Sequence, residues 1–507
     1  PGRMSMFDLI ANINGAVNSF VWGLPMLVLL VGTGILMTVL TKCFQLTHFK
    51  YWMKHTLGGI FRNKKVTEHT SKEDRQISQF QSLCTALAAT IGTGNIAGVA
   101  AALATGGPGS IFWMWITAFF GMMTNYSENV LGIFYRRKNI HGEWSGGAMY
   151  YLSDGLGNKK GCKKIGKALA VLFATFCVIA SFGIGNMSQI NSIAVNMNTV
   201  FNIPSVVTGA VLMLVAGLVI VGGIKRIASV TEKLVPFMAV AYVLGAIIIV
   251  IFNYSQIVPA FAAIIKGAFA MKAVGGGIVG SGVRSAVTWG MKRGVFSNEA
   301  GLGSSVMVHS ASNVKEPVQQ GMWGIFEVFA DTIVVCTLTA LAVLTSGVMD
   351  LNTGAMISQA EKTALVSESF SVVFGPAGGA FIAIAILLFA FSTTLGWSIY
   401  GTKAFEYLFG TKATIGYKVL FVVFIVIGAT MNLELAWDLS DTFNGLMAIP
   451  NLIGVITLSG TVSKITKNYI DRKFHGKDIT PMYSAFPVIQ REQEEIVKAE
   501  KKEEAVI

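Results

Sequence analysis

The residues best suited to chemistry lie in a glycine-rich stretch of a long apolar run. Residues 90–98 read Thr-Ile-Gly-Thr-Gly-Asn-Ile-Ala-Gly, inside an apolar segment that extends from Gln79 to Thr105. A helix loses about 1 kcal/mol per glycine relative to alanine, and Thr93 and Asn95 add polar groups that are costly to leave unpaired inside a bilayer. We therefore expect the segment to break here. Freed amide N–H groups suit a carboxylate, and freed carbonyls suit Na⁺.

A second polar and glycine-interrupted stretch covers residues 296–305, Phe-Ser-Asn-Glu-Ala-Gly-Leu-Gly-Ser-Ser. Glu299 lies within it, and an acid inside a membrane segment is a functional hypothesis by default. The alternative is that Glu299 is a protonated or hydrogen-bonded acid that orders the broken backbone. For both stretches, glycines that only permit close helix packing are the simpler alternative.

Polar side chains in two other apolar runs suit the same chemistry. Gln189 and Asn186 are amides that can bind a zwitterion without adding charge, or else join neighbouring helices. The run Ser392-Thr393-Thr394 offers hydroxyl oxygens, which are hard ligands suitable for Na⁺, although such hydroxyls often bond back to their own helix. Trp397, one turn further on, is either an apolar lid over a site or a core residue.

Three further acids fall in or near apolar runs. Glu327 and Asp331 are spaced i, i+4, so on a regular helix they share one face. Either they form a proton or cation relay, or they are a structural polar pair. Glu128 is interpreted mainly as a structural partner of a neighbouring basic loop.

Composition defines the class of protein. The chain has 507 residues, of which 53% are hydrophobic and 13% are charged, compared with about 25% charged in soluble domains. It is therefore a polytopic membrane protein. The net charge of +12 reflects short basic blocks between apolar runs and does not indicate nucleic-acid binding. The five cysteines and six histidines lack the spacing of a disulfide framework or of a metal site. The only metal ion expected is Na⁺.

Apolar runs of about 20 residues predict eleven spans in an all-α membrane protein. We expect them near 17–41, 79–105, 110–135, 168–198, 204–223, 234–254, 294–311, 320–346, 376–400, 416–434 and 442–462. Residues 44–62 are predicted to form an amphipathic helix on the inner surface. Residues 260–289, which include Gly275–Gly277, Gly280 and Gly282, are predicted to form an outer-face hairpin or re-entrant element. The charged tail is expected to be disordered at its end.

The predicted organisation has four parts. The first, residues 1–78, holds the leading span and the amphipathic helix. Residues 79–254 and 255–465 each hold five spans, the second preceded by the outer-face element, and residues 466–507 form a cytoplasmic tail. Because five is odd, the two sets of five have opposite topology, and each opens with a broken span. Matching breaks in two inverted halves are the sequence sign of a transporter site.

Loop charge predicts the orientation. With the N-terminus outside and the C-terminus in the cytoplasm, 32 of the 39 Lys and Arg residues fall in the inner segments. The positive-inside rule favours this arrangement in the cell membrane.

The two breaks carry a resemblance to a known family. Residues 88–99, followed by Gly106-Gly107-Pro108-Gly109 and Phe112-Trp113-Met114-Trp115, look like the signature of the alanine or glycine:cation symporters, also called the sodium:alanine symporter family. Residues 294–303 and 393–397 match as well, and the resemblance covers about residues 10 to 465. It implies ten spans in the 5+5 inverted-repeat fold of the leucine transporter plus an extra leading helix. It also implies Na⁺-coupled uptake of alanine, glycine or glutamine by alternating access.

The resemblance also implies the site residues. The residues expected to contact substrate are Thr93, Gly94, Gln189, Phe296, Asn298 and Trp397. Sodium is expected between carbonyls near Ala89 and Gly92 and the hydroxyls of Thr393 and Thr394, with Asn95 and Glu299 as polar support. No cofactor is expected besides Na⁺ as coupling ion, and no nucleic acid. Proton coupling remains an alternative through Glu299. A channel lacks the required polar stripe or charged ring, and an enzyme that uses Glu299, Glu327, Asp331 or His309 lacks any nucleophile–base spacing.

Overall fold

The computed structural model describes residues 6–71, 73–269, 281–432 and 434–506. This described part is almost entirely helical, as the sequence predicted. Its only ladder pairs two short antiparallel strands, β1 (Arg137–Lys138) and β2 (Trp144–Ser145), in the described ranges.

The helices before residue 200 include the first broken segment. They are α1 (Met6–Val21), α2 (Leu24–Leu40), α3 (Phe44–Thr47), α4 (Phe49–His55), α5 (Leu57–Arg62), α6 (Lys64–Thr67), α7 (Gln79–Thr90), η1 (Thr93–Asn95), α8 (Ala97–Gly106), α9 (Gly109–Phe134), α10 (Ala148–Tyr150), η2 (Tyr151–Leu156), α11 (Lys163–Phe182), η3 (Gly183–Met187) and α12 (Ser188–Phe201).

The helices after residue 200 include the second broken segment and the tail. They are α13 (Ser205–Val221), α14 (Gly223–Phe252), η4 (Tyr254–Gln256), α15 (Ile257–Phe269), α16 (Ser281–Asn298), α17 (Val306–His309), α18 (Pro317–Val328), η5 (Phe329–Cys336), α19 (Thr337–Thr345), α20 (Lys362–Phe374), α21 (Pro376–Phe409), η6 (Thr411–Ala413), α22 (Thr414–Thr430), α23 (Glu434–Leu446), α24 (Ala448–Thr457), α25 (Ser459–Lys473) and α26 (Pro487–Val506).

Six helices of the described chain are long and apolar enough to cross a membrane, and eight if each of two bent pairs counts as one span. The chain is therefore a multi-pass membrane protein. The bent pairs are α7 with residues 93–106, at 62°, and residues 434–457 with α25, at 56°. The predicted break in residues 79–105 thus coincides with one of the two strong bends. Eleven spans and two inverted repeats stay predictions.

Three predicted segments differ in the structure. The second broken segment is helical well before residue 294, since α16 covers Ser281–Asn298 without a break. Gly275–Gly277 and Gly280 lie outside the described residues. The predicted amphipathic helix is three short helices, α3 to α5. The expectation of a disordered tail end is wrong, since residues 487–506 form α26.

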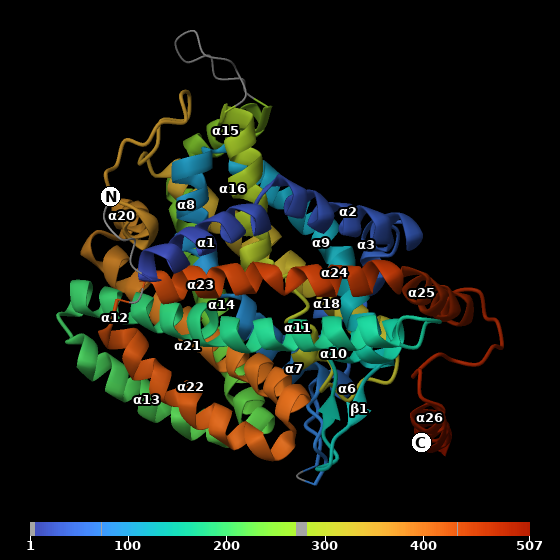
Figure 1. Cartoon of the computed structure of the whole chain (residues 1–507). Helices are drawn as coiled ribbons and strands as arrows, with labels where there is room; N and C mark the ends of the chain where they lie inside the picture. Colours follow the sequence, from blue (N-terminus) through green and yellow to red (C-terminus); the bar gives the residue numbers. More distant parts are fainter. Residues whose placement is uncertain (1–5, 72, 270–280, 433, 507) are drawn as a thin grey trace.

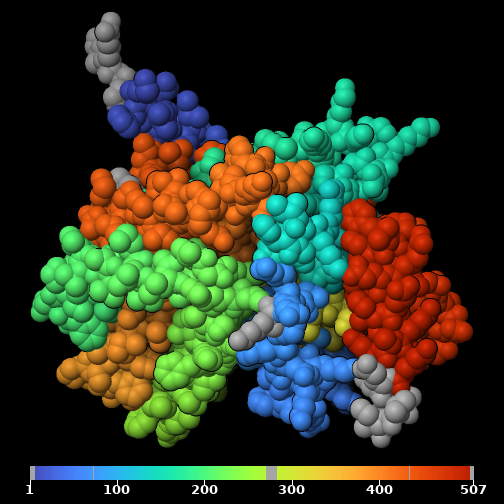
Figure 2. Space-filling view, turned by 90° about the horizontal axis from the view of Figure 1, so that it is seen from below, coloured from blue at the N-terminus to red at the C-terminus, as the bar shows by residue number. Residues whose placement is uncertain are grey.

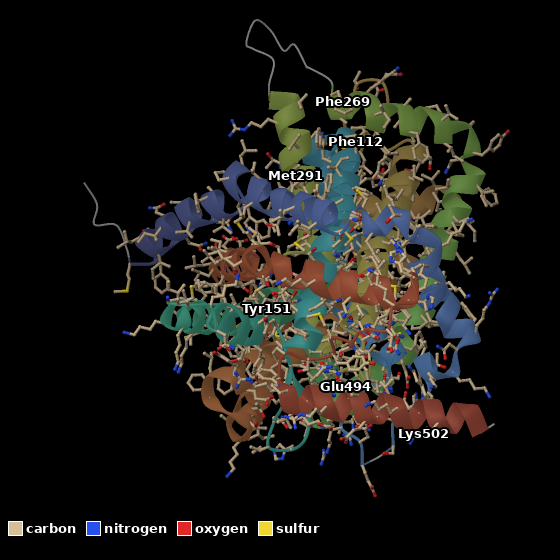
Figure 3. The ribbon with its side chains drawn as sticks, turned by 90° about the vertical axis from the view of Figure 1, so that its right-hand side faces the viewer. Phe112, Tyr151, Phe269, Met291, Glu494 and Lys502 are labelled. Atoms are coloured by element: carbon tan, nitrogen blue, oxygen red, sulfur yellow. The ribbon has the colours of Figure 1, made fainter. Side chains whose placement is uncertain are left out.

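The two ends of the bundle are marked by α15 and α26. Phe269 of α15 lies against Phe112 at the start of α9, with ring centroids 5.1 Å apart, and Glu494 and Lys502 of α26 lie at the opposite end (Figure 3). We call these two ends the α15 face and the α26 face. Since Ala485, just before α26, donates its N–H to the carbonyl of Phe134 at the other end of α9 (2.9 Å), α9 runs from one face to the other.

The two broken segments run in opposite directions. At the α26 face, α7 begins in a capping box in which Ser78 and Gln81 exchange side-chain and backbone hydrogen bonds of 3.1 Å. Its continuation α8 ends at Gly106, beside Trp289 of α16. The chain of α16 therefore starts near the α15 face and passes its break towards α17 and the α26 face.

Long helices hold the breaks in place. The longest, α21, starts at Pro376 after Gly375 with φ +57° and ends before Gly410 with φ +87°, two conformations that glycine adopts at little cost. It packs directly on α7, since a Cβ on Gly396 would lie 2.5 Å from the Cβ of Ala89. Figure 1 shows α11 and α12 running alongside α23 and α24, with α13 beside α22.

The tail covers part of the α26 face. Figure 2 shows the C-terminal segments, in red, next to the yellow segment that contains the α17–α18 connection. The contacts are ionic and polar: Lys315 of that connection pairs with Glu500 at 2.6 Å, and Lys138 pairs with Glu492 at 2.5 Å.

Candidate functional site

The first break is a single tight turn between α7 and α8. The α7 ladder ends where the N–H of Ile91 donates to Leu87 O (2.7 Å), and the turn η1 follows at Thr93–Asn95. Asn95 Oδ1 accepts the N–H of Gly92 at 2.9 Å, which replaces the helical bond that Gly92 loses. Only glycine fits at residue 92, because a Cβ there would lie 2.4 Å from Thr393 Oγ1.

The second break is built from left-handed backbone. After α16 ends at Asn298, φ is +57° at Glu299, +92° at Gly301 and +75° at Gly303. A positive φ is uncommon outside glycine and marks strain that the surrounding structure must hold. Asn298 supplies part of that support: its Oδ1 accepts the N–H of Ala300 (3.0 Å) and its Nδ2 donates to Thr332 Oγ1 (3.0 Å).

The two breaks meet. A Cβ on Gly94 would lie 3.3 Å from the ring of Phe296 and 3.5 Å from Ser297 Cα, so the two breaks are in direct contact. Thr93 and Asn298 therefore belong to adjoining interrupted segments and not to continuous helices.

One buried carboxylate joins both breaks. Asp331 of η5 accepts hydrogen bonds from Asn95 Nδ2 of the first break (2.7 Å) and from Ser297 Oγ of the second (2.8 Å). Thr332 Oγ1 donates to the same carboxylate at 2.8 Å. Within the described residues, Asp331 has no salt bridge, and it is fully buried. The arrangement is a negative group with hydroxyl neighbours at the junction of two unwound segments.

A small cavity of about 20 Å³ lies beside this junction. That volume has room for about one water molecule. Its lining comes from the first break, from α16, from η3 and α12, and from α21: Ala89, Thr90, Gly92, Thr93, Gly94, Ile184, Gln189, Phe296, Glu299, Thr393 and Trp397.

The cavity holds one unpartnered polar atom. Gln189 is 3% exposed and its Nε2 donates to Ile184 O (3.2 Å), but its Oε1 has no hydrogen-bond partner. That oxygen lies 3.5 Å from the position of a Cβ on Gly92. A buried acceptor without a donor costs about 1–3 kcal/mol, so a ligand with an N–H group would relieve a cost that the protein carries here.

The acid of the second break also faces the cavity. Glu299 Oε1 accepts from Trp397 Nε1 at 3.1 Å, and its Oε2 accepts from Ser304 Oγ at 2.5 Å. Trp397 is itself fixed by close packing, since a Cβ on Gly185 would lie 2.5 Å from its Cβ. One wall of the cavity is therefore a hydrogen-bonded carboxyl–indole pair and not a mobile side chain.

The hydroxyls of α21 meet the end of α7. Thr393 Oγ1 donates to the carbonyls of Ala88 (3.1 Å) and Ile91 (3.3 Å), and Ser392 Oγ lies 3.2 Å from Ala88 O. The sequence predicted the carbonyls of Ala89 and Gly92, each one residue later in the chain than the carbonyls that the hydroxyls contact. Because Ala89 packs on Gly396, the carbonyls of Ala88 and Ile91 face the hydroxyls of Ser392 and Thr393.

Two expected participants have other partners. Thr394 Oγ1 donates to Ala390 O in its own helix at 3.0 Å, which is the ordinary behaviour of a helical threonine. Asn298 does not line the cavity; its side chain holds Thr332 and the backbone of the second break. The other expected substrate contacts, Thr93, Gly94, Gln189, Phe296 and Trp397, do line it.

The acids are distributed differently from the sequence interpretation. Residues 329–336 form a π-helical segment. Glu327 and Asp331 do not bond to each other: Asp331 accepts from both breaks, whereas Glu327 Oε2 lies 2.8 Å from His309 Nε2. Glu128 has no partner in the basic loop among the described residues. It accepts from Asn451 Nδ2 of α24 at 2.5 Å, deep in the bundle. The sequence interpretation therefore missed the joining role of Asp331, whose only sequence signal was an acid within an apolar run.

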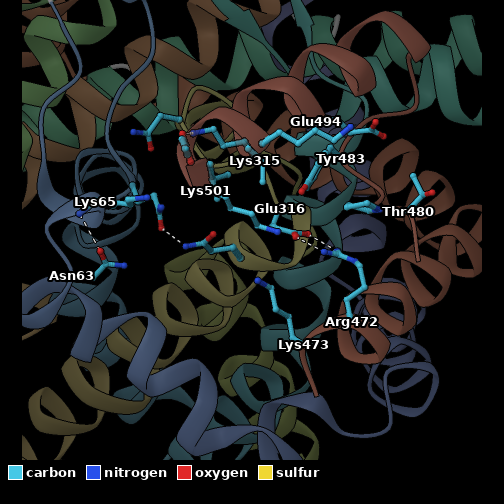
Figure 4. Close-up of a pocket in the computed structure, with 18 of the residues that line it drawn as sticks. Asn63, Lys65, Lys315, Glu316, Arg472, Lys473, Thr480, Tyr483, Glu494 and Lys501 are labelled. Carbon is cyan, nitrogen blue, oxygen red and sulfur yellow. Dashed lines mark hydrogen bonds and ion pairs between the residues drawn. The ribbon is translucent and has the colours of Figure 1, made fainter. Parts of the chain in front are cut away.

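A much larger cleft, of about 1220 Å³, lies at the α26 face. Figure 4 shows its charged lining from α6, the α17–α18 connection, α25 and α26, with Glu316 and Arg472 in a two-bonded ion pair of 2.7 and 2.9 Å. This cleft is open and lies away from both breaks, so we assign the function of the breaks to the small cavity.

The comparisons with known proteins agree with this geometry. The sequence model of the sodium:alanine symporter family matches residues 7–483. The sodium/alanine symporter AgcS of Methanococcus maripaludis is 46% identical over 462 residues, which cover 91% of this chain and 97% of that protein. The probable sodium/glutamine symporter GlnT of Bacillus subtilis is 36% identical over 475 residues, 93% of each chain.

Among solved structures, the crystal structure of MhsT in complex with L-phenylalanine resembles this fold. Its TM-score is 0.50 at 14% identity, over 78% of this chain and 99% of that chain. At that identity the likeness concerns the fold alone.

Proposed function

The chain belongs to the sodium:alanine symporter family, and from this premise we propose that it takes up a small neutral amino acid together with Na⁺ by alternating access. Membership supports cation-coupled amino-acid symport. The choice of substrate and of ion is our own inference from the site.

The observation that carries the proposal is the unpartnered oxygen of Gln189 in a cavity between the two breaks. An amino-acid ammonium group would donate to this oxygen. The carboxylate would face the amide groups at the start of η1, where the first N–H groups of a helical turn have no partner inside the turn. No Lys or Arg lines the cavity, which suits a zwitterion better than a dianion.

The size of the cavity favours the smaller amino acids of the family. Its walls include Phe296, Ile184 and Trp397, and its volume of about 20 Å³ leaves little room for a side chain. The cavity must therefore enlarge before any amino acid can enter, and alanine or glycine requires the smallest enlargement. Glutamine, which is named for one relative, needs the Glu299–Trp397 wall to open.

Two groups of oxygens suit the coupling ion, since hard cations take oxygen ligands. One is the Asp331 carboxylate with the hydroxyls of Ser297 and Thr332. The other is formed by the hydroxyls of Ser392 and Thr393 with the carbonyls of Ala88 and Ile91. We propose that Na⁺ binds at both, and that its charge at Asp331 holds the two breaks together around the substrate. Asn95 and Glu299 support these sites as hydrogen-bond partners.

We further propose that the α26 face is cytoplasmic and that the N-terminus lies outside, in the cell membrane. The basic connections before α7, after α9 and before α18 all lie at the α26 face, in agreement with the positive-inside rule. Alternating access would open the cavity first to the α15 face and then to the α26 face.

The test is uptake by purified protein in proteoliposomes. Labelled alanine should accumulate only with an inward Na⁺ gradient at fixed pH, and unlabelled glycine should compete better than glutamine. Equal uptake without Na⁺ but with an inward proton gradient would favour the proton-coupled alternative, and flux without saturation would indicate a channel.

A further inference from the structure

A second buried polar group lies between the breaks and the α26 face. His309 at the end of α17 and Glu327 of α18 are both fully buried, with His309 Nε2 2.8 Å from Glu327 Oε2. Asn125 Nδ2 of α9 donates to the same carboxylate oxygen at 2.9 Å. On the other side of the ring, His309 Nδ1 lies 2.5 Å from Gln320 Nε2, which is also 3.0 Å from Ser82 Oγ of α7. The group thus joins four helices.

The group has more acceptors than donors. Three of its fully buried oxygens have no hydrogen-bond partner: Glu327 Oε1, Gln320 Oε1 and Asn129 Oδ1. Gln320 and Glu327 lie on one side of α18, and Asn129 reaches the same helix by donating to Gln320 O at 3.4 Å. Buried acceptors without donors are costly, so the group is short of positive charge or of protons.

We propose that His309 and Glu327 form a proton-binding site, separate from the substrate cavity, whose loading is linked to the transport cycle. With Gln320 Nε2 facing the ring, Nδ1 is an acceptor and the imidazole carries a single proton on Nε2. If the Gln320 amide turns over, its unpartnered oxygen faces Nδ1, which then carries a second proton. The two orientations of one amide therefore differ by one proton on His309.

A proton fits this group better than a metal ion. Na⁺ takes oxygen ligands, whereas the centre of this group is a ring nitrogen between an amide and a carboxylate. No group of three His, Cys, Asp or Glu side chains with metal-ligand geometry occurs in the described part of the chain. Histidine is the side chain whose proton affinity is closest to physiological pH.

Several other ionisable groups lie around the pair. The carboxyls of Glu128 on α9, Glu299 at the second break and Asp331 on η5 all interact with the charge of Glu327, as does the hydroxyl of Tyr400 on α21. From α7 the neutral side chain of Ser82 meets the group, with its Oγ 3.0 Å from Gln320 Nε2. The buried cation Arg136 is held by the carbonyls of Ser310, Ser312 and Val314 beyond the end of α17. Lys315, six residues after His309, pairs with Glu500 of α26.

The position of the pair connects the proton to movement. Each broken segment has one half on the side of the α26 face, α7 in the first segment and α17 in the second. His309 links α17 to α18, and Gln320 links α18 to α7. Opening the cavity towards the α26 face must change these distances. A hydrogen bond in which both His309 and Glu327 are charged is stronger than one in which only the carboxylate is charged, so the bound proton stabilises the form in which this side is closed. This link rests on the proposed transport function, whereas the proton site itself does not.

The first arm of the test reads the proton directly. The chain has six histidines, so an NMR spectrum of ¹⁵N-histidine-labelled protein contains few ring signals. The signals that are present in the wild type and missing in His309→Gln belong to His309. We expect this ring to carry one proton at the alkaline end of a pH series and two at the acidic end, and to keep one state throughout in Glu327→Gln. A wild-type ring that keeps one protonation state throughout overturns the proposal, whatever the transport activity.

The second arm measures alanine affinity by thermal stabilisation at saturating Na⁺. One linked proton changes the affinity up to about tenfold per pH unit within the titration range. His309→Gln should reduce the change to less than twofold, and Gln320→Leu, which keeps both titrating groups but removes the turning amide, should do the same. His475→Gln, at an exposed histidine of the α26 face, should keep the wild-type profile.

Two outcomes of the second arm are distinct. A wild-type affinity that does not change with pH, or a change that survives in both His309→Gln and Gln320→Leu, overturns the link to transport. An absence of alanine binding at every pH refutes the proposed function instead, and the first arm then decides the proton site alone.

Discussion

Replacing Asp331 by asparagine tests the junction of the two breaks most sharply. The side chain keeps its size, and an amide oxygen can still accept from Asn95 Nδ2 while the hydroxyls of Ser297 and Thr332 reverse to meet the new N–H group. The fold should therefore survive. What is lost is one full negative charge at a fully buried position between the breaks.

The size of the effect follows from electrostatics. A unit charge about 4 Å from a cation contributes about 4 kcal/mol at an effective dielectric constant of about 20. Lower desolvation of the neutral side chain offsets part of this. If about 3–4 kcal/mol remain, the Na⁺ concentration for half-maximal uptake rises about 100- to 1,000-fold, at 1.4 kcal/mol per factor of ten.

The assay is uptake of labelled alanine into proteoliposomes over a series of Na⁺ concentrations at constant ionic strength. Glu406→Gln is the control, because Glu406 is a buried acid near the end of α21 whose partners are Lys403, Asn139 and Ser145, away from the junction. Its Na⁺ dependence should stay within about threefold of wild type. A normal Na⁺ dependence in Asp331→Asn, with folded protein, would refute the assignment of an ion to this carboxylate.

Three other changes probe the remaining parts of the site. Gln189→Leu removes the unpartnered oxygen. Because a hydrogen bond to a charged group contributes about 1.5–3 kcal/mol, alanine affinity, measured by thermal stabilisation, should fall at least about tenfold. The melting temperature without substrate should be unchanged or higher. Gly92→Ala places a Cβ 2.4 Å from Thr393 Oγ1 and should abolish uptake and lower the melting temperature, whereas Gly416→Ala, with nothing within 4 Å, should do neither. Asn298→Ala removes the hydrogen bonds that support the second break. We therefore expect loss of alanine binding and a loss of about 1–2 kcal/mol of folding stability, measured by thermal unfolding. Full alanine affinity in this variant would show that the support is dispensable.

The backbone breaks were readable from sequence because their cause is local. Glycines and polar side chains in the middle of an apolar run interrupt a helix wherever that run is placed. The bend at residues 91–92 and the positive φ values after Asn298 follow from these residue types. Composition identified a membrane protein for the same reason, since the length of apolar runs and the fraction of charged residues do not depend on tertiary contacts.

The partners of the polar side chains depend on tertiary structure. Asp331 meets Asn95 across 236 residues of chain, and Asn451 reaches Glu128 across 323 residues. Asp331 and Glu327 are four residues apart but bond to different elements, Asp331 to both breaks and Glu327 to His309 and Asn125. The packing of Gly396 on Ala89 places the carbonyls of Ala88 and Ile91 against the hydroxyls of α21. The sequence by itself determined where the helices break, because each glycine or polar residue lowers helix stability locally, whatever its neighbours in space are. Only the packed bundle decided which groups the breaks bring together, because a helix rotation of one residue changes every contact between facing side chains.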